Sequence, residues 1–527
     1  MIRLREIKVP VFDDDIKKYL CKKFPIDLND ILDLKINKKS IDARKKEIYF
    51  VYEVDISLKN EKNLLQKKYK NISITPKEIY LFNNFGSKKI KKRPVIVGSG
   101  PAGLFCAYLL SENGYRPIII ERGEKIEDRV KTVSKFWKDG KLNKNSNVQF
   151  GEGGAGTFSD GKLNTLVKDK SFRMKKVFEI FVEMGAPKDI LYVNKPHIGT
   201  DILRDVIINM RNKIISLGGE FRYNNLMSDI NIESGSIKSI ILNNKEELFC
   251  DDLVLAIGHS SRDTFSLLYN KNFNMEAKPF AVGIRVQHSQ KMINLHQYGN
   301  YDLPPASYKL THKCSNGRGV YSFCMCPGGF VVNASSEEKS LVINGMSNND
   351  RNSGVANSAI VVTVSPKDFG MHPLDGMNFQ RDLEEKTYKI GNGNIPIQYY
   401  KDFKDNKLTN TKSVQNVKFK GNYQFANLNL IMPNYITDSL KEGIDSFNSK
   451  INGFNNDDVI LAAIESRTSS PVRIIRNENF ESNFKGIYPA GEGAGYAGGI
   501  TTSAIDGIKI AEVIMGKYAP FERGNIS

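Results

Sequence analysis

The sequence predicts an α/β protein with a parallel sheet, a β-rich insertion and a small α+β module in front. Three observations support this. Short apolar strands alternate with helices between residues 95 and 257. The pattern becomes β-rich from about residue 281 to 364. Residues 48–58 alternate between apolar and polar side chains, as in a half-buried strand.

The length of 527 residues, 40% of them hydrophobic, exceeds that of a single domain and indicates about three units. We predict an amino-terminal α+β module at 1–90 and a discontinuous dinucleotide-binding domain at 91–280 plus 466–527. The residues between, 281–465, form an inserted substrate or cap domain. No internal repeat is visible.

The amino-terminal module is expected to contain a helix over 13–23 and strands over 31–36 and 48–58. It ends at the linker 86–94, where a glycine, a proline and several lysines mark a boundary. Residues 1–93 contain 24 Lys and Arg against 13 Asp and Glu, which is +11 of the net charge of +17. The surplus is either a solubilising surface or a surface for RNA.

The parallel sheet begins at a glycine loop. An apolar strand, 95–97, runs into the loop Gly98, Ser99, Gly100, Pro101, Ala102 and Gly103, which opens a helix. Gly98 permits a tight turn, Gly100 lets the backbone approach a diphosphate, and Gly103 lets the helix pack closely on the strand. The helix N-terminus then meets the negative charge. This order of elements predicts a Rossmann-like dinucleotide-binding domain.

An acidic residue completes the pattern. Glu121 ends the next strand, 18 residues after Gly103, and is expected to accept hydrogen bonds from the adenosine ribose. A carboxylate there repels a 2′-phosphate, which argues against NADP at this loop. We further expect a helix over 200–217 that is capped at Thr200 and Asp201, and a strand over 253–257 that ends at Gly258.

Several motifs carry a resemblance. They are the 118–123 run, which contains Glu121 and Arg122, and the segments 151–163, 196–201, 324–329, 467–473 and 488–507. Together with the glycine loop they resemble the two-dinucleotide-fold flavoprotein superfamily, and within it the uncharacterised bacterial FAD-dependent dehydrogenases. The resemblance covers nearly the whole chain and implies FAD as the cofactor, but no particular substrate.

The resemblance also implies where FAD is bound. It places 156–162 beside the flavin, and the residues expected to contact FAD there are Gly156, Thr157, Asp160, Gly161 and Lys162. Near the carboxyl end, a strand, glycines and a helix follow one another, and Glu492 stands where the superfamily holds the ribityl chain with an acidic residue. The neighbouring residues expected at the cofactor are Gly258, Gly491, Gly498, Gly499 and Ile500.

The candidate catalytic residues are Cys324, Cys326 and His259. In a regular strand, Cα atoms two residues apart lie near the 7 Å limit for a disulfide, so a redox pair would need a local kink. Packing is the alternative for both thiols. His259 is a candidate proton donor, or else a structural hydrogen-bonding group like His197 and His288.

Arg285, Arg467 and Arg473 are expected either to bind an acidic group or to form internal ion pairs. The six cysteines are too scattered for a disulfide framework, and no zinc, iron–sulfur or haem spacing is present. No signal peptide or membrane span is visible, so we expect a cytoplasmic protein of unknown oligomeric state.

The sequence therefore predicts an FAD-dependent oxidoreductase that acts on a small organic substrate by hydride transfer at the flavin N5 position. Because only one complete dinucleotide loop is present, NAD(P)H is expected as a transient electron donor at most. The alternatives are a flavoprotein recruited to RNA through its basic amino-terminal module, and a protein that holds FAD without turnover.

Overall fold

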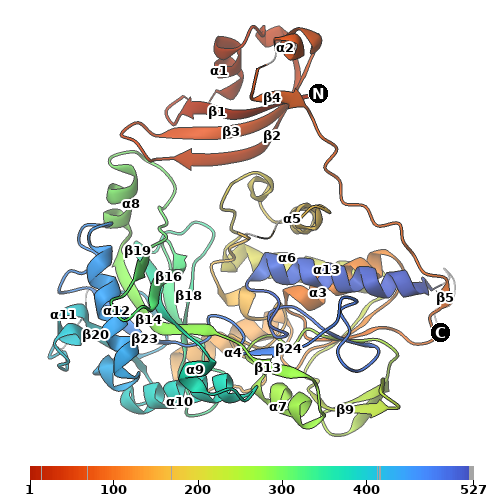
Figure 1. The fold of residues 1–527 in the computed structure, drawn as a ribbon, viewed down its shortest axis with the longest axis vertical. Coiled ribbons are helices and arrows are strands. Elements are labelled where there is room, and N and C mark those ends of the chain that lie inside the picture. The colour runs from red at the N-terminus through yellow and green to blue at the C-terminus, as the bar shows by residue number, and fades with distance from the viewer. Residues whose placement is uncertain are drawn as a thin grey trace.

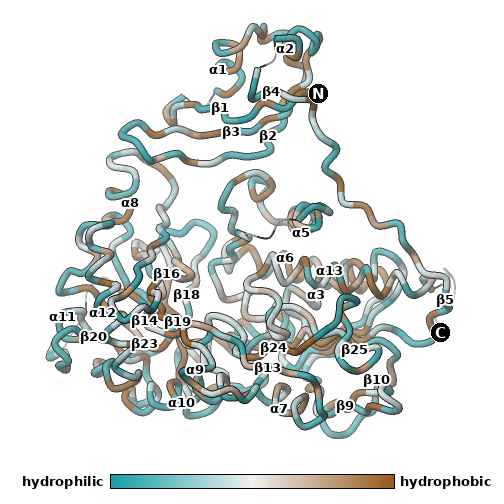
Figure 2. The backbone as a smooth tube through the Cα atoms, in the orientation of Figure 1, coloured by the Kyte–Doolittle hydropathy of each residue, from teal (hydrophilic) through white to brown (hydrophobic). Residues whose placement is uncertain are grey.

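The computed structural model describes residues 1–13, 15–67, 69–165, 167, 169–411, 414 and 417–521. The last six residues of the dinucleotide-binding domain as predicted, 522–527, lie outside this part of the chain. Figure 1 shows an α/β body with a separate small sheet at the amino-terminal end. Hydrophobic residues gather along the strands of the two large sheets (Figure 2). The predicted fold class is confirmed.

The amino-terminal module is an antiparallel sheet with strand order β2-β3-β1-β4. Its elements are β1 (Ile2–Pro10), α1 (Ile16–Lys23), β2 (Ile31–Asp42), β3 (Tyr49–Leu58), α2 (Lys62–Gln66) and β4 (Ile72–Ile74). The sequence analysis missed β1, because a bulge at Glu6, with φ of 54°, interrupts its apolar alternation. The predicted strand at 31–36 continues to Asp42.

The module contacts the main body through its strand β2. The amide of Lys39 donates to the carbonyl of Tyr192, and the amide of Asn194 donates to the carbonyl of Lys39. An extended tether joins the two parts, and β5 (Lys88–Lys89) within it pairs in parallel with β26 (Tyr518–Ala519). The two ends of the cofactor-binding body therefore meet at one edge.

The second unit contains a five-stranded parallel sheet with the order β25-β12-β6-β7-β8. Its strands are β6 (Val95–Val97), β7 (Ile118–Ile120), β8 (Glu220–Arg222), β12 (Leu253–Leu255) and β25 (Ile487–Pro489). Successive side chains point to opposite faces, so Ile96 and Val95 join different cores. Both faces are covered, which is why the strands are apolar throughout.

Helices cover one face of this sheet and a small antiparallel sheet covers the other. The helices are α3 (Pro101–Glu112), α5 (Arg173–Glu183), α6 (Thr200–Ser216) and α13 (Ile500–Lys517). On the other face lie β9 (Met227–Glu233), β10 (Ser236–Leu242), β11 (Glu246–Phe249) and α7 (Arg262–Asn270). Helix α4 (Ile126–Asp139) and the pair β13 (Met275–Ala277) and β24 (Val472–Ile474) complete the unit.

The predicted cap of α6 is wrong. Gly199, not Thr200 or Asp201, is the N-cap residue, and Thr200 is the first helical residue. The Thr200 hydroxyl instead donates to the carbonyl of Thr157 and so ties α6 to the loop that carries Thr157.

The inserted unit is built on a seven-stranded sheet with the order β15-β16-β19-β14-β23-β20-β22. These strands are β14 (Phe280–Ser289), β15 (Thr311–Lys313), β16 (Gly319–Cys326), β19 (Val355–Val364), β20 (Ile395–Tyr399), β22 (Tyr423–Phe425) and β23 (Ile460–Glu465). A smaller sheet contains β17 (Phe330–Asn333), β18 (Ile343–Met346) and β21 (Phe419–Lys420). The helices are α8 (Gln290–Tyr298), α9 (Pro366–Phe369), α10 (Asp375–Ile390), α11 (Tyr400–Lys404) and α12 (Asn434–Phe447).

The two faces of the seven-stranded sheet differ in polarity. Along β14, Val282, Ile284 and Val286 pack against α8 and α12. The alternate residues face the other side, where Arg285 forms a buried ion pair with Glu465 of β23. The second face thus includes a buried ion pair among apolar side chains such as Ala281, Ala359 and Val361. Among the described residues, no helix combines the length and apolar character that a membrane crossing requires.

Candidate functional site

The turn between β6 and α3 requires glycine at two positions. Gly98 has φ of 99°, and a Cβ there would lie 2.2 Å from the carbonyl oxygen of Ala256. A Cβ on Gly103 would lie 1.9 Å from the carbonyl oxygen of Gly98. Any side chain at either residue would force the strand and the helix apart. The tight turn and close helix packing expected at these two glycines are both present.

Two helix N-termini open beside this turn. Helix α3 has Gly100 as its N-cap residue, and α13 has Gly499. The helices pack so closely that a Cβ on Gly507 of α13 would lie 2.1 Å from the carbonyl oxygen of Ala102 in α3. Each N-terminus presents unpaired backbone N–H groups and a partial positive charge. Together they make a site for a strongly negative group.

A buried arginine of α4 holds a second glycine loop in shape, and a backbone hydrogen bond joins this loop to the first. The Arg129 guanidinium donates to the backbone carbonyls of Asn147, Val148, Glu152 and Gly154, and burial lowers its pKa to about 10. The amide of Gly153 donates to the carbonyl of Ser99 at 2.9 Å. We call the loops 98–103 and 151–156, with the N-termini of α3 and α13, the glycine floor. Arg129 was not predicted, since its partners are main-chain groups that no motif reveals.

Glu121 lines the cavity and also joins the two loops. Its carboxylate accepts hydrogen bonds from the Ser99 amide and hydroxyl, the Gly123 amide and the Gly151 amide, at 2.6–3.1 Å. The sequence did not predict these contacts, and the ribose contact expected of Glu121 stays a prediction. The neighbouring Arg122 pairs with Asp263 at 2.6 Å and stacks on Phe150.

A cavity of about 560 Å³ lies above the glycine floor. The following predicted residues line it: Gly98, Ser99, Gly100, Pro101, Ala102, Glu121, Arg122, Gly156, Asp160, Lys162, Gly258, His259, Cys324, Glu492, Gly498, Gly499 and Ile500. Gly103, Thr157, Gly161, Gly491 and Cys326 lie behind its surface. The lining that was not predicted includes Phe323, Asn344 and Glu465 of the insertion, together with Thr468 and Ser469, which follow it. Arg467, expected to bind an acidic group or form an internal ion pair, also lines the cavity.

The predicted residues that do not line the cavity hold its lining in position. The Gly491 amide donates to Asp506 of α13 at 2.7 Å, and the Asp506 carboxylate also pairs with Arg476. A Cβ on Gly161 would lie 2.9 Å from the amide nitrogen of Gly199, so that glycine allows two loops to approach each other. Cys326 is fully buried beneath Cys324.

A group of buried and half-buried charges, which we call the charged wall, lies at the same cavity. It consists of Asp160, Lys162, Arg285, Arg351 and Glu465, together with Cys324 and Cys326. Lys162 lies 3.3 Å from Asp160, and its ammonium also donates to the carbonyl of Met325. Arg351 pairs with Asp160 at 2.6 Å. These ion pairs connect the segment 160–162 to the insertion.

The histidines have different environments. His259 lines the cavity with Nδ1 3.7 Å from a Glu492 carboxylate oxygen, and its buried Nε2 has no hydrogen-bond partner among the described residues. His197 and His288 contact the backbone carbonyls of Asn349 and Phe454. Of the three, only His259 is available to a ligand in the cavity.

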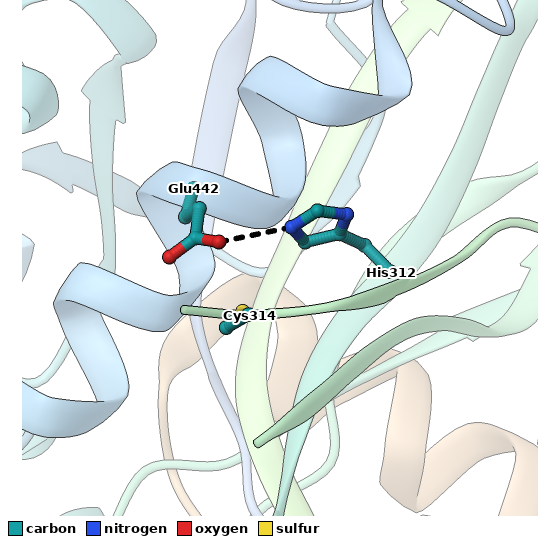
Figure 3. A group of neighbouring side chains, drawn as sticks. All are labelled: His312, Cys314 and Glu442. Atoms are coloured by element: carbon teal, nitrogen blue, oxygen red, sulfur yellow. Dashed lines mark hydrogen bonds and ion pairs between the residues drawn. The ribbon is translucent and has the colours of Figure 1, made fainter. Parts of the chain in front are cut away.

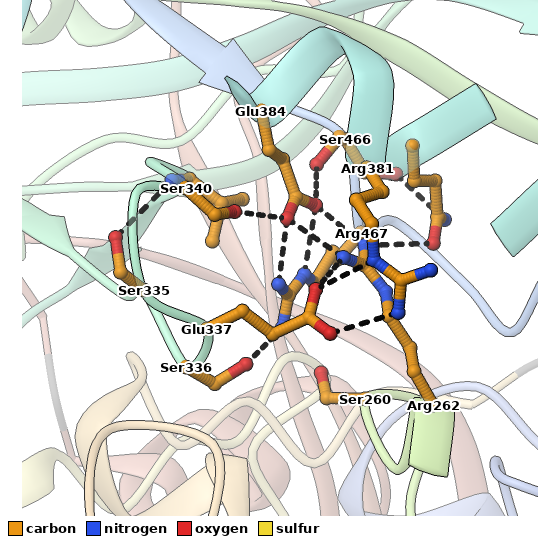
Figure 4. A network of polar contacts seen from close by, with 12 residues as sticks. Ser260, Arg262, Ser335, Ser336, Glu337, Ser340, Arg381, Glu384, Ser466 and Arg467 are labelled. Atoms are coloured by element: carbon orange, nitrogen blue, oxygen red, sulfur yellow. Dashed lines mark hydrogen bonds and ion pairs between the residues drawn. The ribbon is translucent and has the colours of Figure 1, made fainter. Parts of the chain in front are cut away.

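A buried ion network joins the insertion to the dinucleotide-binding unit (Figure 4). Glu384 of α10 pairs with Arg262 of α7 and with Arg467, each at 2.7 Å. Ser340 and Ser466 donate to the same carboxylate, and Glu337 pairs with Arg262 and Arg381. The two arginines hold the pKa of Glu384 far below its usual range despite its burial. Arg285 and Arg467 are thus internal ion-pair residues, and Arg473 pairs with Glu276.

A smaller cavity of about 210 Å³ adjoins the first. The two cavities share Phe323, Thr468 and Ser469, and the smaller one is otherwise lined by Pro279, Phe280, Ala281, Tyr321 and Thr363. Its walls are largely apolar and aromatic. It therefore extends the main cavity with a pocket suited to a hydrophobic group.

One further cluster contains metal-ligand side chains, and Figure 3 shows that it lies between β15 and α12. His312, Cys314 and Glu442 bring their ligand atoms within 4.8 Å of one another. His312 bonds Glu442 directly at 3.0 Å, and both carboxylate oxygens also accept from Ser315. These contacts account for the arrangement as an internal hydrogen-bonded cluster.

The large cavity fits a flavin dinucleotide in three respects. A Cβ on Gly258, Gly498 or Gly499 would meet no atom within 4 Å, so these glycines keep space open that side chains would fill. The buried Nε2 of His259 and Nε of Arg122 have no partner among the described residues. The two helix N-termini supply the positive end that a diphosphate needs.

Comparison with protein families divides the chain into three matches. Residues 279–468 match the FAD-dependent protein, C-terminal domain-like family, and residues 96–144 match the NAD(P)-binding Rossmann-like domain. Residues 1–57 match a domain of unknown function.

Among curated proteins, the chain is 48% identical over 531 residues to an uncharacterized protein of Clostridium beijerinckii, covering 98% of this chain and 99% of the relative. Among solved structures, glycine oxidase from Geobacillus kaustophilus is 10% identical with a TM-score of 0.37, covering 83% of this chain and 98% of its own. CtdE in complex with FAD is 10% identical with a TM-score of 0.33, covering 81% and 84%.

Proposed function

Because the chain belongs to the family of FAD-dependent proteins that includes the Clostridium beijerinckii relative, we propose that it oxidises or reduces a small organic substrate in the large cavity. FAD is its cofactor and, when bound, supplies two-electron hydride chemistry at N5. One observation carries the proposal. The glycine floor and a wall of reactive side chains face each other across a single cavity of about 560 Å³.

We assign the binding of FAD to the glycine floor. The N-termini of α3 and α13 place two partial positive charges on one side of the cavity, where they stabilise a diphosphate. Glu121 fixes the two glycine loops relative to each other, and Arg129 holds the second loop through its backbone carbonyls. Glu492 lines the same cavity and offers carboxylate oxygens to the hydroxyl groups of a ribityl chain.

We assign substrate binding to the part of the cavity near Phe323. The apolar pocket beyond Phe323 suits a hydrophobic part of a small molecule, and Asn344, Thr468 and Ser469 offer hydrogen bonds nearer the floor. His259, beside Glu492, can hold or release a proton at its Nε2. Reduced nicotinamide is proposed only as a visiting electron donor.

The test is anaerobic reduction of the purified yellow protein. Candidate donors, namely NADH, NADPH, thiols, amines and hydroxy acids, are added one class at a time, and the absorbance of oxidised flavin is followed. We expect rapid bleaching by at least one class and turnover with a suitable acceptor. A protein that binds FAD tightly and is bleached by none of them contradicts catalysis.

A pair of histidine variants sharpens this test. His259→Gln should retain FAD but lower kcat by about 10²-fold or more, because general acid–base groups contribute on that scale. His197→Gln is the control, since His197 bonds a backbone carbonyl outside the cavity lining. Equal kcat values for the two variants would remove His259 from the reaction.

A further inference from the structure

Two thiols lie on a bulged strand at the edge of the cavity. Strand β16 pairs Phe323 with Ala359 and Cys326 with Asn357, so β16 contains one residue more than β19 between these pairs. Cys324, inside this bulge, has φ of 42°. A β-bulge kinks the strand locally, and such a kink is what a disulfide between residues two apart requires. The Cys326 thiol turns back and donates to the carbonyl of Cys324 at 3.3 Å.

The two thiols have unequal access. Cys324 lines the large cavity and is partly exposed, whereas Cys326 is fully buried behind it. The Lys162 ammonium lies 3.9 Å from the Cys326 sulfur. A molecule in the cavity can therefore reach Cys324 first, and Cys326 only through Cys324. This is the arrangement of an attacking thiol and a resolving thiol.

The charges around the pair are unbalanced. Three cations lie in the charged wall, on Lys162, Arg285 and Arg351, against two carboxylates, on Asp160 and Glu465. The Arg285 guanidinium also donates to the Cys324 carbonyl at 3.2 Å. A buried excess of positive charge is unfavourable unless an anion is added. A thiolate supplies that anion without any further residue.

The same contacts shift the pKa values of the two thiols in opposite directions. The adjacent Cys326 thiol and the cations Lys162 and Arg285 hold the pKa of Cys324 well below the usual thiol range. The interaction with Cys324 and burial raise the pKa of Cys326 well above it. The thiol that faces the cavity is thus the more acidic of the two, and the thiolate is the nucleophile of thiol–disulfide exchange.

We propose that Cys324 and Cys326 form a redox pair that exchanges with small disulfides entering the cavity, which makes low-molecular-weight thiols and disulfides the substrate class. This inference rests on the proposed function, because it concerns the substrate of the same cavity.

The exchange balances as follows. The Cys324 thiolate attacks one sulfur of the substrate R–S–S–R, an S–S bond forms to Cys324, and R–S⁻ leaves and takes a proton from solvent. The Cys326 thiol loses its proton and attacks the Cys324 sulfur, so the intramolecular disulfide forms and a second R–S⁻ leaves. The second R–S⁻ takes the proton released by Cys326. The substrate has gained two electrons and two protons; the pair has lost two electrons and the one proton of Cys326, and solvent has supplied the other proton. When FAD is bound in the same cavity, its reduced form would supply the electrons that return the pair to the dithiol state.

Lys162 gives the second attack its driving force. While Cys324 is a thiolate, its charge opposes ionisation of Cys326. In the mixed disulfide that charge has gone, and the nearby Lys162 ammonium then favours a thiolate at Cys326. The Cys326 thiolate thus replaces the negative charge that left with the first R–S⁻, and this charge leaves in turn with the second R–S⁻ when the disulfide closes.

The first test is intact-mass analysis of FAD-loaded protein treated with bis(2-hydroxyethyl) disulfide. Wild type, with six free thiols, should lose two of them and gain no adduct. Cys326→Ala should accumulate one mercaptoethanol adduct, and peptide mapping should place it on Cys324. Cys314→Ser is the matched control, because this buried thiol lies outside the cavity lining, and it should behave as wild type.

The second test is alkylation by iodoacetamide at pH 6.5, followed residue by residue. Cys324 should react about tenfold faster than the partly exposed Cys21, since greater ionisation outweighs the lower nucleophilicity of an acidic thiol. Equal rates would overturn the inference, as would wild type that keeps six thiols or retains an adduct. If Cys326→Ala loses FAD, the wild-type thiol count and the alkylation rates still decide.

The inference and the proposed function fail differently. Mass and alkylation readouts need no flavin turnover. If another donor class bleaches the flavin while the thiols stay inert, the proposed function stands and the redox pair is excluded. If the pair exchanges but no donor, including dithiols, bleaches the flavin, the pair stands and flavin catalysis fails.

Discussion

The glycine floor and the charged wall face the same cavity but are built in different ways. The floor consists mainly of backbone, from the loops 98–103 and 151–156 and from the N-terminus of α13 far along the chain, and its central requirement is the absence of side chains at Gly98 and Gly103. The wall consists of side chains from distant segments, such as Lys162, Arg285 and Glu465. Backbone amides carry fixed dipoles, whereas carboxylates, thiols and ammonium groups titrate. The cofactor side is therefore constant, and the substrate side responds to pH and charge.

The largest effect should come from the ion network that fastens the wall to the cofactor-binding unit. Glu384→Gln leaves Arg262 and Arg467 buried with only one ionised partner between them, Glu337 beside Arg262, and should lower the free energy of unfolding by about 3–5 kcal/mol. Urea denaturation at pH 7 measures this. Glu276→Gln breaks the exposed pair with Arg473 and should change stability by less than about 1 kcal/mol. Comparable losses in both variants would contradict the role of the network.

The next effect concerns the floor alone. Gly98→Ala introduces a Cβ 2.2 Å from the Ala256 carbonyl oxygen at a φ of 99°, and should cost about 3 kcal/mol together with most FAD retention. Absorbance of the purified protein and thermal unfolding report the two losses. Gly235→Ala is the matched control, because its φ is 74° but its Cβ would meet no atom within 4 Å. If Gly98→Ala stays as yellow and as stable as Gly235→Ala, close packing at the floor is not required.

A third prediction tests the pH response of the insertion. Burial lowers the pKa of His288, three residues after Arg285 on β14, to about 4. The unfolded chain, with a histidine pKa of about 6.5, then binds more protons than the folded one between these values. This contribution to stability is complete above pH 6.5 and is lost as the pH falls towards 4, by about 2 kcal/mol at pH 4.5.

Unfolding free energies at pH 7.0 and 4.5 measure this effect. The drop between the two pH values should be about 2 kcal/mol smaller in His288→Gln than in wild type. The exposed His372, replaced by Gln, is the control and should leave the drop unchanged. An identical drop in all three proteins would show that His288 titrates normally.

The smallest effect should come from Lys162 within the wall. Lys162→Gln removes the cation beside Cys326 and should slow closure of the disulfide about tenfold, because the resolving thiol ionises less readily. Quenched-flow mass analysis of the mixed disulfide measures the rate. Lys144→Gln, which removes a surface lysine paired with Glu338, should leave it unchanged. An unchanged rate of disulfide closure in Lys162→Gln would show that Lys162 does not assist the resolving thiol.

The predictability of the two regions follows from their construction. A strand, a glycine turn and a helix are local in sequence, so the loop at 98–103 and the segment at 491–500 were recognisable as motifs. The pairing of Glu384 with Arg262, and the approach of Lys162 to Cys326, depend on segments more than a hundred residues apart that the fold brings together. Cys324 was predicted as a candidate catalytic residue, but the sequence pattern of β16 does not predict the bulge.

Glu121 illustrates a related limit, in which a recognised motif reveals only some of the contacts of a residue. Its position after β7 predicts ribose binding, but the loops that carry Gly123 and Gly151 also bring backbone N–H groups to its carboxylate. The sequence does not predict which backbone amides reach the carboxylate, because nearly every residue has one. Similarly, β1 was missed because one residue of left-handed backbone at Glu6 breaks its pattern.

The discontinuity of the cofactor-binding unit has a consequence for biosynthesis. Helix α3 is made early, but α13, which packs against it and completes the floor, follows about four hundred residues later. A nascent chain emerging from the ribosome can fold its amino-terminal sheet and then its insertion, while the strands around β6 await β25. Cofactor capture is therefore a late event in maturation, and until then the apolar flank of α3 requires shielding by a chaperone or by the unfinished polypeptide itself.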